Sequence, residues 1–274
     1  MRSYPSERAH TACYNRHSPK KTRVRILFIS DIHANQEGLE ACLAVAPAYD
    51  AIVNLGDIVG YGASPNEAAD RSRALGGVVV RGNHDKACAG VMGIESFNPI
   101  AGLSALWTKQ SLTPENLEWL KALPAGPVPL PGVEGVQCVH GSPLDEDDYL
   151  IVVRDAVEPL TETEVAITFF GHTHIQGGFS VDGGRWETLR PMYHTKDQVE
   201  NVELPLKREA KYMLNPGSVG QPRDGDSRAA FASFDSESWK LTFHRVPYNI
   251  SGAQKKILAA KLPERLATRL SEGR

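Results

Sequence analysis

Short apolar runs of strand length recur along the first two thirds of the chain, and each stops at a glycine or a polar residue. The run at residues 25–30 ends at Asp31, and similar runs end at residues 55, 80, 139 and 170. They are rich in β-branched and aromatic residues, which is typical of strands buried on both faces. Helical stretches lie between the runs, at residues 36–46, 66–75 and 115–123. This alternation of strands and helices predicts an α/β fold.

The pattern changes after about residue 175. Residues 181–184 predict a hairpin turn between two strands, and residues 229–235 and 239–246 predict an antiparallel pair. The last 22 residues predict two helices that are interrupted at Leu262-Pro263. We therefore expect one domain with two sheets at residues 23–252, and a C-terminal helical extension packed on it at residues 253–274.

The amino-terminal residues and the overall composition narrow the classes of protein to consider. Residues 1–22 are polar and basic and lack the apolar stretch of a signal peptide, so we expect a disordered tail. The 30 Lys and Arg residues are balanced by 33 Asp and Glu residues, which disfavours dedicated nucleic-acid binding. No apolar run is long enough to span a membrane. A homo-oligomer remains open.

Four cysteines lie far apart in the chain and form no CxxC pair: Cys13, Cys42, Cys88 and Cys138. This spacing indicates reduced, mostly buried thiols in a cytoplasmic protein, and it disfavours a disulfide framework or a zinc knuckle.

Candidate metal ligands follow the ends of five successive predicted strands. In open α/β sheets, ligands bind beyond the carboxyl ends of the strands. Imidazole and carboxylate groups suit Zn, Mn and Fe, and two neighbouring cations need a shared carboxylate with several neutral donors. Each motif alone is typical of a turn, but the five together predict a two-metal site. The candidate ligands are Asp31, His33, Asp57, Asn83, His140, His172 and His174.

These motifs resemble the signature of the calcineurin-like metallophosphoesterase family. The resemblance extends from about residue 24 to residue 220. It rests on Asp31-Ile32-His33, Gly56-Asp57, Gly82-Asn83-His84-Asp85, His140-Gly141 and Gly171-His172-Thr173-His174. It implies a four-layer αββα sandwich of two mixed β-sheets flanked by helices.

The resemblance also implies roles for individual residues. One metal would bind Asp31, His33, Asp57 and His174, and a second would bind Asp57, Asn83, His140 and His172, with Asp57 as the bridge. His84 would be the general acid, or would help Asn83 to hold the phosphate. A metal-bridging hydroxide would attack phosphorus in line. Mn²⁺ is our first expectation for the two divalent ions, and Fe, Zn, Co or Ni suit the same ligands. Asp85 is expected to cap a turn or to support a ligand.

The chain departs from some relatives directly after Asp57. The protein Ser/Thr phosphatases and dinucleoside tetraphosphatases of this family carry Gly-Asp-x-x-Asp-Arg-Gly, whereas residues 56–62 here read GDIVGYG. The missing Asp and Arg favour the small bacterial and archaeal phosphodiesterase-like branch, and a small phosphodiester or phosphomonoester as the substrate. Residues 140–143 and 215–220 resemble that branch as well.

Arg223 is the candidate for the missing phosphate contact, because an arginine can bind phosphate through two parallel hydrogen bonds. In the alternative interpretation, Arg223 pairs with Asp224 or Asp226 and stiffens its loop. Tyr61 and Asn98 are further candidates for lining the pocket. Phe97, Trp107 and Trp119 lie in a helical insert at residues 88–120 and are interpreted as core.

Two other functions stay open. Some proteins with this fold have lost activity and serve as binding or scaffold proteins, and a nuclease acting on short oligonucleotides would use a similar site. The presence of His84 and of all seven ligand positions favours an enzyme over a scaffold. The lack of a basic excess disfavours the nuclease.

Overall fold

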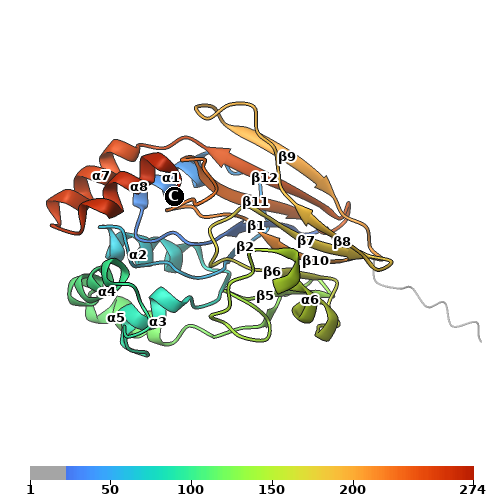
Figure 1. The fold of residues 1–274 in the computed structure, drawn as a ribbon, viewed down its shortest axis with the longest axis horizontal. Helices are drawn as coiled ribbons and strands as arrows, with labels where there is room; N and C mark the ends of the chain where they lie inside the picture. Colours follow the sequence, from blue (N-terminus) through green and yellow to red (C-terminus); the bar gives the residue numbers. More distant parts are fainter. Residues whose placement is uncertain (1–22) are drawn as a thin grey trace, which may run out of the picture.

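Two six-stranded β-sheets, flanked by helices, form the centre of the protein (Figure 1). The computed structural model describes residues 23–274, so the predicted tail at residues 1–22 lies outside the described residues. The strands are β1 (Arg25–Ile29), β2 (Ala51–Asn54), β3 (Val78–Val79), β4 (Val128–Pro129), β5 (Val136–Cys138), β6 (Ile167–Phe169), β7 (Gly177–Asp182), β8 (Arg185–Leu189), β9 (Glu200–Pro205), β10 (Lys211–Asn215), β11 (Ala229–Asp235) and β12 (Lys240–Val246). The helices are α1 (Gln36–Val45), α2 (Pro65–Leu75), α3 (Asn83–Ala89), α4 (Pro99–Ser111), α5 (Pro114–Lys121), α6 (Val153–Glu162), α7 (Ile250–Ala259) and α8 (Glu264–Glu272).

Both sheets are mixed. The strand order of the first sheet is β3-β2-β1-β11-β12-β9, in which β1, β2 and β3 are parallel and β11 runs antiparallel to β1. The second sheet has the order β4-β5-β6-β10-β7-β8, in which β5, β6 and β10 are parallel. Each sheet therefore presents the carboxyl ends of three parallel strands at one edge.

The inner faces of the two sheets pack against each other through apolar side chains. Phe28 of β1 stacks on Phe169 of β6 with their ring centroids 3.7 Å apart, and both rings are fully buried. Ile26 and Phe28 face the second sheet, whereas Leu27 and Ile29 lie in a separate cluster with α1. Burial on both faces explains why this strand lacks an alternation of apolar and polar residues.

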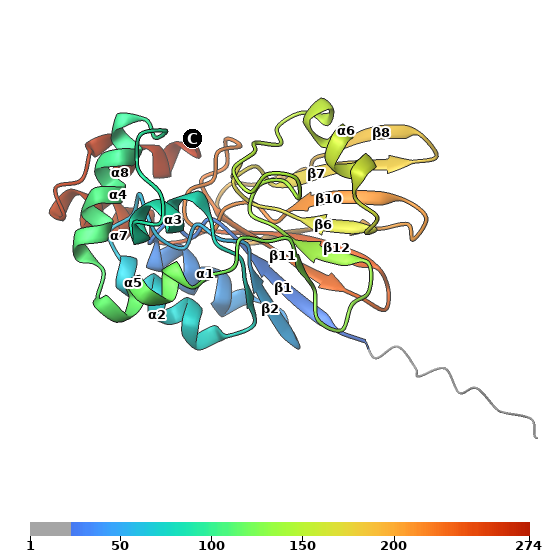
Figure 2. The same cartoon turned by 90° about the horizontal axis from the view of Figure 1, so that it is seen from below.

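Helices cover the outer face of each sheet. The cluster outside the first sheet includes residues of α1, α2, α3 and α5, and α6 packs on β7, β8 and β10 of the second sheet. Figure 1 and Figure 2 both show α6 apart from the other helices. The predicted four-layer αββα sandwich is therefore confirmed.

The carboxyl-terminal helices form a pair, and the predicted break at Leu262-Pro263 separates α7 from α8. Leu266 and Leu270 of α8 share an apolar cluster with Tyr61, so this pair reaches the loop after β2. The division into a domain at residues 23–252 and an extension at residues 253–274 remains a prediction.

Some elements differ from the sequence-based expectation. The strand expected at residues 77–80 is only the two-residue β3, and the edge strand β9 and the helices α3 and α6 were not predicted. Residues along β9 alternate between half-buried and exposed, because only one face of this edge strand packs against the rest of the protein. Cys42, Cys88 and Cys138 are buried free thiols, and Cys13 lies outside the described residues. Among residues 23–274, no helix is long and apolar enough to cross a membrane.

Candidate metal centre

All seven predicted ligands lie in loops, or at a helix start, directly after the carboxyl ends of β1, β2, β3, β5 and β6. The two sheets bring these ends together. The six histidine and aspartate side chains among them are almost completely buried, with at most 3% of any of them exposed. Six polar groups of this kind, gathered in the interior, need partners that compensate for their lost hydration.

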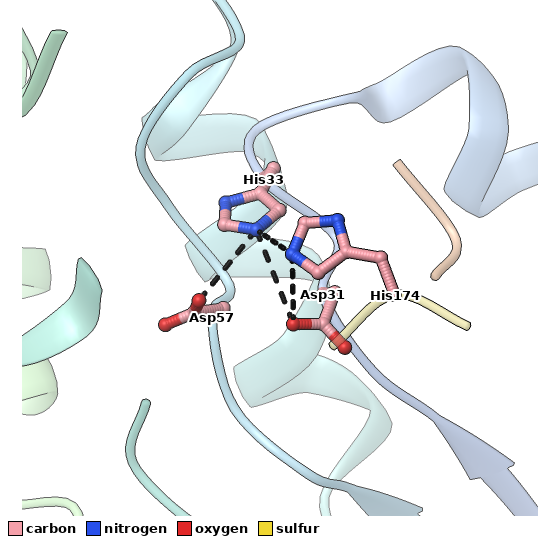
Figure 3. Close-up of side chains that lie close together, drawn as sticks. All are labelled: Asp31, His33, Asp57 and His174. Carbon is pink, nitrogen blue, oxygen red and sulfur yellow. Dashed lines mark hydrogen bonds and ion pairs between the residues drawn. The ribbon is translucent and has the colours of Figure 1, made fainter. Parts of the chain in front are cut away.

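The first group of candidate ligands contains Asp31, His33, Asp57 and His174, whose ligand atoms lie within 4.8 Å of one another. Figure 3 shows the four side chains pointing toward a common point. His33 Nε2 lies 3.0 Å from His174 Nε2, and His174 Nε2 lies 3.3 Å from Asp31 Oδ1. This group has the composition expected for the first metal.

The second group contains Asp57, His140 and His172. His140 Nε2 lies 3.0 Å from His172 Nδ1 and 3.4 Å from Asp57 Oδ2. The same Asp57 Oδ2 lies 3.5 Å from His33 Nε2, so a single carboxylate oxygen belongs to both groups. Asn83, the fourth residue expected here, has a buried Oδ1 with no hydrogen-bond partner. An uncharged acceptor in this situation fits a metal ligand.

Each of the four histidines contacts a backbone carbonyl oxygen with one ring nitrogen. The contacts are His33 Nδ1 with Val59 at 3.2 Å, His140 Nδ1 with Leu55 at 2.7 Å, His172 Nε2 with Asp147 at 3.1 Å and His174 Nδ1 with Gln221 at 2.6 Å. Because a carbonyl oxygen can only accept, the ring nitrogen that faces it carries the proton. When the ring is neutral, its other nitrogen therefore directs a lone pair toward the centre. Histidines that ligate metals are held in this way, so the donor set fits two cations.

The backbone at the site adopts an uncommon conformation. Asp31, His33, Asp57, His172 and His174 have φ between +48° and +65°, a range in which few residues other than glycine are found. Backbone hydrogen bonds hold this geometry, including Asp31 N to Gly56 O and His33 N to Asp57 O, both at 2.9 Å. Residues held in sparsely populated regions cluster at functional sites, and this signal is absent from the sequence.

Two glycines allow the loops to approach each other closely. Gly56 has φ +97°, which requires glycine, whereas Gly82 does not have a positive φ. A Cβ atom at Gly82 would collide with Asp57 Oδ1. Gly82 is therefore required by close packing against the shared carboxylate, in addition to the turn that the sequence predicted.

In the absence of cations, protons compensate for much of the buried negative charge of the centre. Burial raises the pKa of Asp31 to about 7, although His140 opposes this shift. Burial also disfavours the charged form of Asp57, but His140 and His84 outweigh it and hold its pKa well below the usual range. Burial lowers the pKa of His140, yet Asp57 overcomes this effect and raises it to about 10. Bound cations would replace such protons.

His84, the predicted general acid, begins α3 beside Asn83. Its backbone N–H donates to Asp57 Oδ1 at 2.8 Å, and its ring lies against Tyr61 and Phe97 with centroid distances of 4.3 and 4.7 Å. The buried Nδ1 has no partner. Burial lowers the pKa of His84 to about 4, which Asp57 only partly offsets, so the free protein carries a neutral imidazole.

Asp85 has a structural role at the site. Its carboxylate accepts from the backbone N–H groups of Gly82 at 3.0 Å and of Ile58 and Val59 at 2.9 and 3.2 Å. It therefore joins the loop after β3 to the loop after Asp57, in agreement with the expected turn cap.

Arg223 lies next to the centre and is not paired with either aspartate of its loop. Asp224 binds Arg245 and Asp226 binds Arg228, so the alternative in which Arg223 pairs with one of them is wrong. The backbone N–H of Arg223 donates to His174 O at 3.2 Å, and its Nη2 donates to Gln221 Oε1 at 3.1 Å. Its buried Nε has no partner, which leaves a donor for an anion.

A cleft of about 360 Å³ opens beside the centre. Asn83, His84 and His172 lie in its wall, together with Tyr61 and Asn98, the two predicted lining residues. The cleft is also lined by Phe97 and Tyr149. Phe97 packs against two apolar clusters of the core, as expected, and its ring also contacts that of His84 at the surface of the cleft. The sequence did not indicate Tyr149 as a lining residue, because it lies outside all of the motifs.

The comparisons with known proteins agree with this geometry. A family model described as calcineurin-like phosphoesterase matches residues 24–176. Uncharacterized protein MJ0912 of Methanocaldococcus jannaschii is 36% identical over 253 residues, which cover 91% of this chain and 98% of that protein.

Two solved structures are also similar. A metallophosphoesterase from Sphaerobacter thermophilus is 37% identical with a TM-score of 0.76, covering 92% of this chain and 99% of that one. Hypothetical protein PH1004 from Pyrococcus horikoshii is 19% identical with a TM-score of 0.72 and the same coverage, and it shares the fold. This chain belongs to the calcineurin-like phosphoesterase family.

Proposed function

We propose that this protein is a dinuclear metal-dependent phosphoesterase that hydrolyses a small phosphodiester or phosphomonoester. The observation that carries the proposal is the position of Asp57 Oδ2, which lies 3.5 Å from His33 Nε2 and 3.4 Å from His140 Nε2. One carboxylate oxygen shared by two buried groups of ligands is the arrangement that a pair of cations requires.

The donors divide between two sites. Asp31, His33 and His174 would hold one cation, and Asn83, His140 and His172 would hold the other, with Asp57 common to both. When bound, two divalent cations supply charge to the phosphoryl oxygens and lower the pKa of a bound water toward neutrality. Mn²⁺ is the first candidate, and Fe, Zn, Co or Ni suit the same mixture of imidazole, carboxylate and amide ligands.

Three side chains of the protein would act on the substrate directly. Arg223 offers an unpaired buried Nε to a phosphoryl oxygen, while Asn83 and His84 lie in the wall of the cleft. Because the His84 imidazole is neutral in the free protein, the negative charge of a bound phosphoryl group is needed to raise its pKa. His84 would then donate its proton to the leaving oxygen.

The shape of the cleft supports a small substrate. Tyr61 stands at the sequence position of the arginine in the Gly-Asp-x-x-Asp-Arg-Gly motif of the related protein phosphatases, and its ring lies 4.6 Å from that of His33. A volume of about 360 Å³ is at the small end of ligand pockets.

The buried atoms that lack partners favour an enzyme over a scaffold protein. Asn83 Oδ1, His84 Nδ1 and Arg223 Nε are all buried without a hydrogen-bond partner. Each buried unsatisfied group costs about 1–3 kcal/mol. A protein that only binds partners through its surface has no need of three such groups at and beside one buried centre.

The proposal is tested by hydrolysis of bis-p-nitrophenyl phosphate and p-nitrophenyl phosphate with Mn²⁺ present, alongside measurement of the bound metal. We expect turnover that depends on metal, with a preference for the diester. Asp57→Asn serves as the inactive control for contaminating phosphatases. If protein that carries two metal ions hydrolysed neither ester, the proposed activity on simple phosphoesters would be wrong.

A further inference from the structure

Aromatic rings from two separate segments of the chain line the cleft next to the metal centre. Phe97 lies in the segment between α3 and α4, on the side of the first sheet. Tyr149 lies in the segment between β5 and α6, on the side of the second sheet. Asn83 and His172, two of the proposed ligands, line the same cleft. A substrate with its phosphoryl group at the metals and the rest of the molecule in this cleft therefore meets aromatic rings from two separate segments.

Tyr149 is a half-exposed ring held in a fixed position. It is 50% exposed, and it packs on His172 with a centroid distance of 3.8 Å and an interplanar angle of 36°. The preceding residues are tied down, since Lys86 Nζ lies 2.6 Å from Asp147 and 3.1 Å from Glu146. A large exposed ring on an anchored loop is ready to stack on a ligand with little loss of conformational entropy.

Phe97 is positioned with similar precision on the other side. Its ring contacts that of His84 at 4.7 Å and 44°. The next residue, Asn98, caps α4 by accepting from Ala101 N at 3.0 Å, which holds the backbone around Phe97. Ser96 and Asn98 add polar side chains to the lining, and Asp147 adds another from the side of Tyr149.

We propose that the cleft binds a planar aromatic substituent of the substrate, of the nucleobase class, between Phe97 and Tyr149. This inference rests on the proposed phosphoesterase function. Every base presents a π-face to an aromatic side chain, and Ser96 and Asn98 add hydrogen-bonding side chains to the cleft for its polar edge. The substrate class is thus a nucleotide phosphoester.

The test compares two substrates that differ only in the base: the methyl esters of adenosine 5′-phosphate and of ribose 5-phosphate. With metal-loaded protein, the base should raise kcat/KM by roughly 5- to 150-fold, the effect of one stacked base. Equal kcat/KM values for the two esters would overturn the inference while leaving the proposed function intact. Hydrolysis of bis-p-nitrophenyl phosphate but of neither methyl ester would also overturn it.

Two variants test whether the preference for the base-bearing ester depends on the ring of Tyr149. Tyr149→Leu keeps an apolar side chain without the aromatic face and should reduce the preference for the base-bearing ester at least several-fold. Leu103→Ala, at a position that is 57% exposed on α4 and outside the cleft, should keep the preference of the unaltered protein. An unchanged preference in Tyr149→Leu would rule out stacking on this ring.

A binding measurement separates this inference from the activity itself. By calorimetry, metal-loaded protein should bind adenosine 5′-phosphate more tightly than ribose 5-phosphate, by a factor in the same range. Equal affinities would overturn the inference. Tighter binding of the base-bearing compound by a protein without turnover would support the aromatic site and reject the proposed function.

Discussion

The Nε2 atoms of His33 and His174 lie 3.0 Å apart, although these residues are 141 positions apart in the sequence. The Nδ1 atom of each ring faces a backbone carbonyl oxygen, and burial holds the pKa of both histidines well below the usual range. Two neutral rings thus direct lone pairs at each other and cannot form a hydrogen bond between them. A cation bound to both nitrogens removes this repulsion, so metal binding and stability are coupled.

Removal of metal is expected to destabilise the protein. Chelation with EDTA should lower Tm, and Mn²⁺ should restore it, because ligands that bind only the folded state stabilise it. At a free metal concentration of 100 times Kd, each site contributes about 2.7 kcal/mol. Differential scanning calorimetry measures the shift. The same Tm with and without EDTA would show that the buried ligand groups do not hold cations.

Asp57→Asn should lower turnover by at least about 10²-fold, because a neutral amide cannot offset the charge of two cations. The bound metal should fall from two ions to one or fewer, as measured by elemental analysis. Asp50→Asn provides a matched control, since Asp50 is a surface partner of Arg25. Full activity in Asp57→Asn would refute the assignment of the bridging ligand.

His84→Ala should lower turnover by about 10²- to 10⁴-fold while both metals stay bound, as expected for the loss of a general acid. The loss should be smaller for p-nitrophenyl esters than for alkyl esters, because a good leaving group needs less protonation. Steady-state kinetics with both types of ester provide the measurement. Loss of metal from this variant would instead identify His84 as a ligand.

Arg223→Lys should weaken kcat/KM for phosphoesters by roughly 10-fold or more. A lysine keeps the charge but loses the planar fork that binds two phosphate oxygens, and hydrogen bonds to charged groups contribute about 1.5–3 kcal/mol. Arg208→Lys is the control, since Arg208 lies over the ring of Trp239, away from the cleft. Unchanged kinetics in Arg223→Lys would exclude a direct role in phosphate binding.

His244 should make the stability of the protein depend on pH. Its ring stacks on Phe231 at 4.3 Å and contacts Asn201 Oδ1 at 2.7 Å, and burial lowers its pKa to about 4. As the pH falls from about 6.5 to about 4, the unfolded chain takes up a proton that the folded state refuses. The free energy of unfolding therefore decreases with falling pH, by up to about 1.4 kcal/mol per pH unit.

The variant His244→Gln tests this contribution. It should lose stability at pH 7, but its free energy of unfolding should fall less than that of the unaltered protein between pH 7 and pH 5, by about 2 kcal/mol. Urea denaturation at the two pH values measures the difference. Parallel pH profiles for the two proteins would contradict the assigned pKa shift of His244.

The sequence alone was sufficient for the α/β class and for most strands of the parallel halves, and it identified the seven candidate ligands that the structure brings together at one edge of the sheets. Strands such as β1 could be predicted because burial on both faces demands a continuous apolar run, which is a local property of the chain. The grouping of these candidate residues could be predicted because metal chemistry limits the residue types, and because parallel strands bring their carboxyl ends to one edge.

Tertiary structure decided the features that depend on contacts between distant segments. Asp224 pairs with Arg245 and Asp226 with Arg228, which excludes the alternative in which Arg223 pairs with an aspartate of its own loop. Phe97 and Tyr149 line one cleft only because the packing of the two sheets brings together the segment between α3 and α4 and the segment between β5 and α6. The amino-acid sequence gives the type and spacing of residues. The partners of buried charges and the residues that line a cleft depend on how distant segments pack in three dimensions.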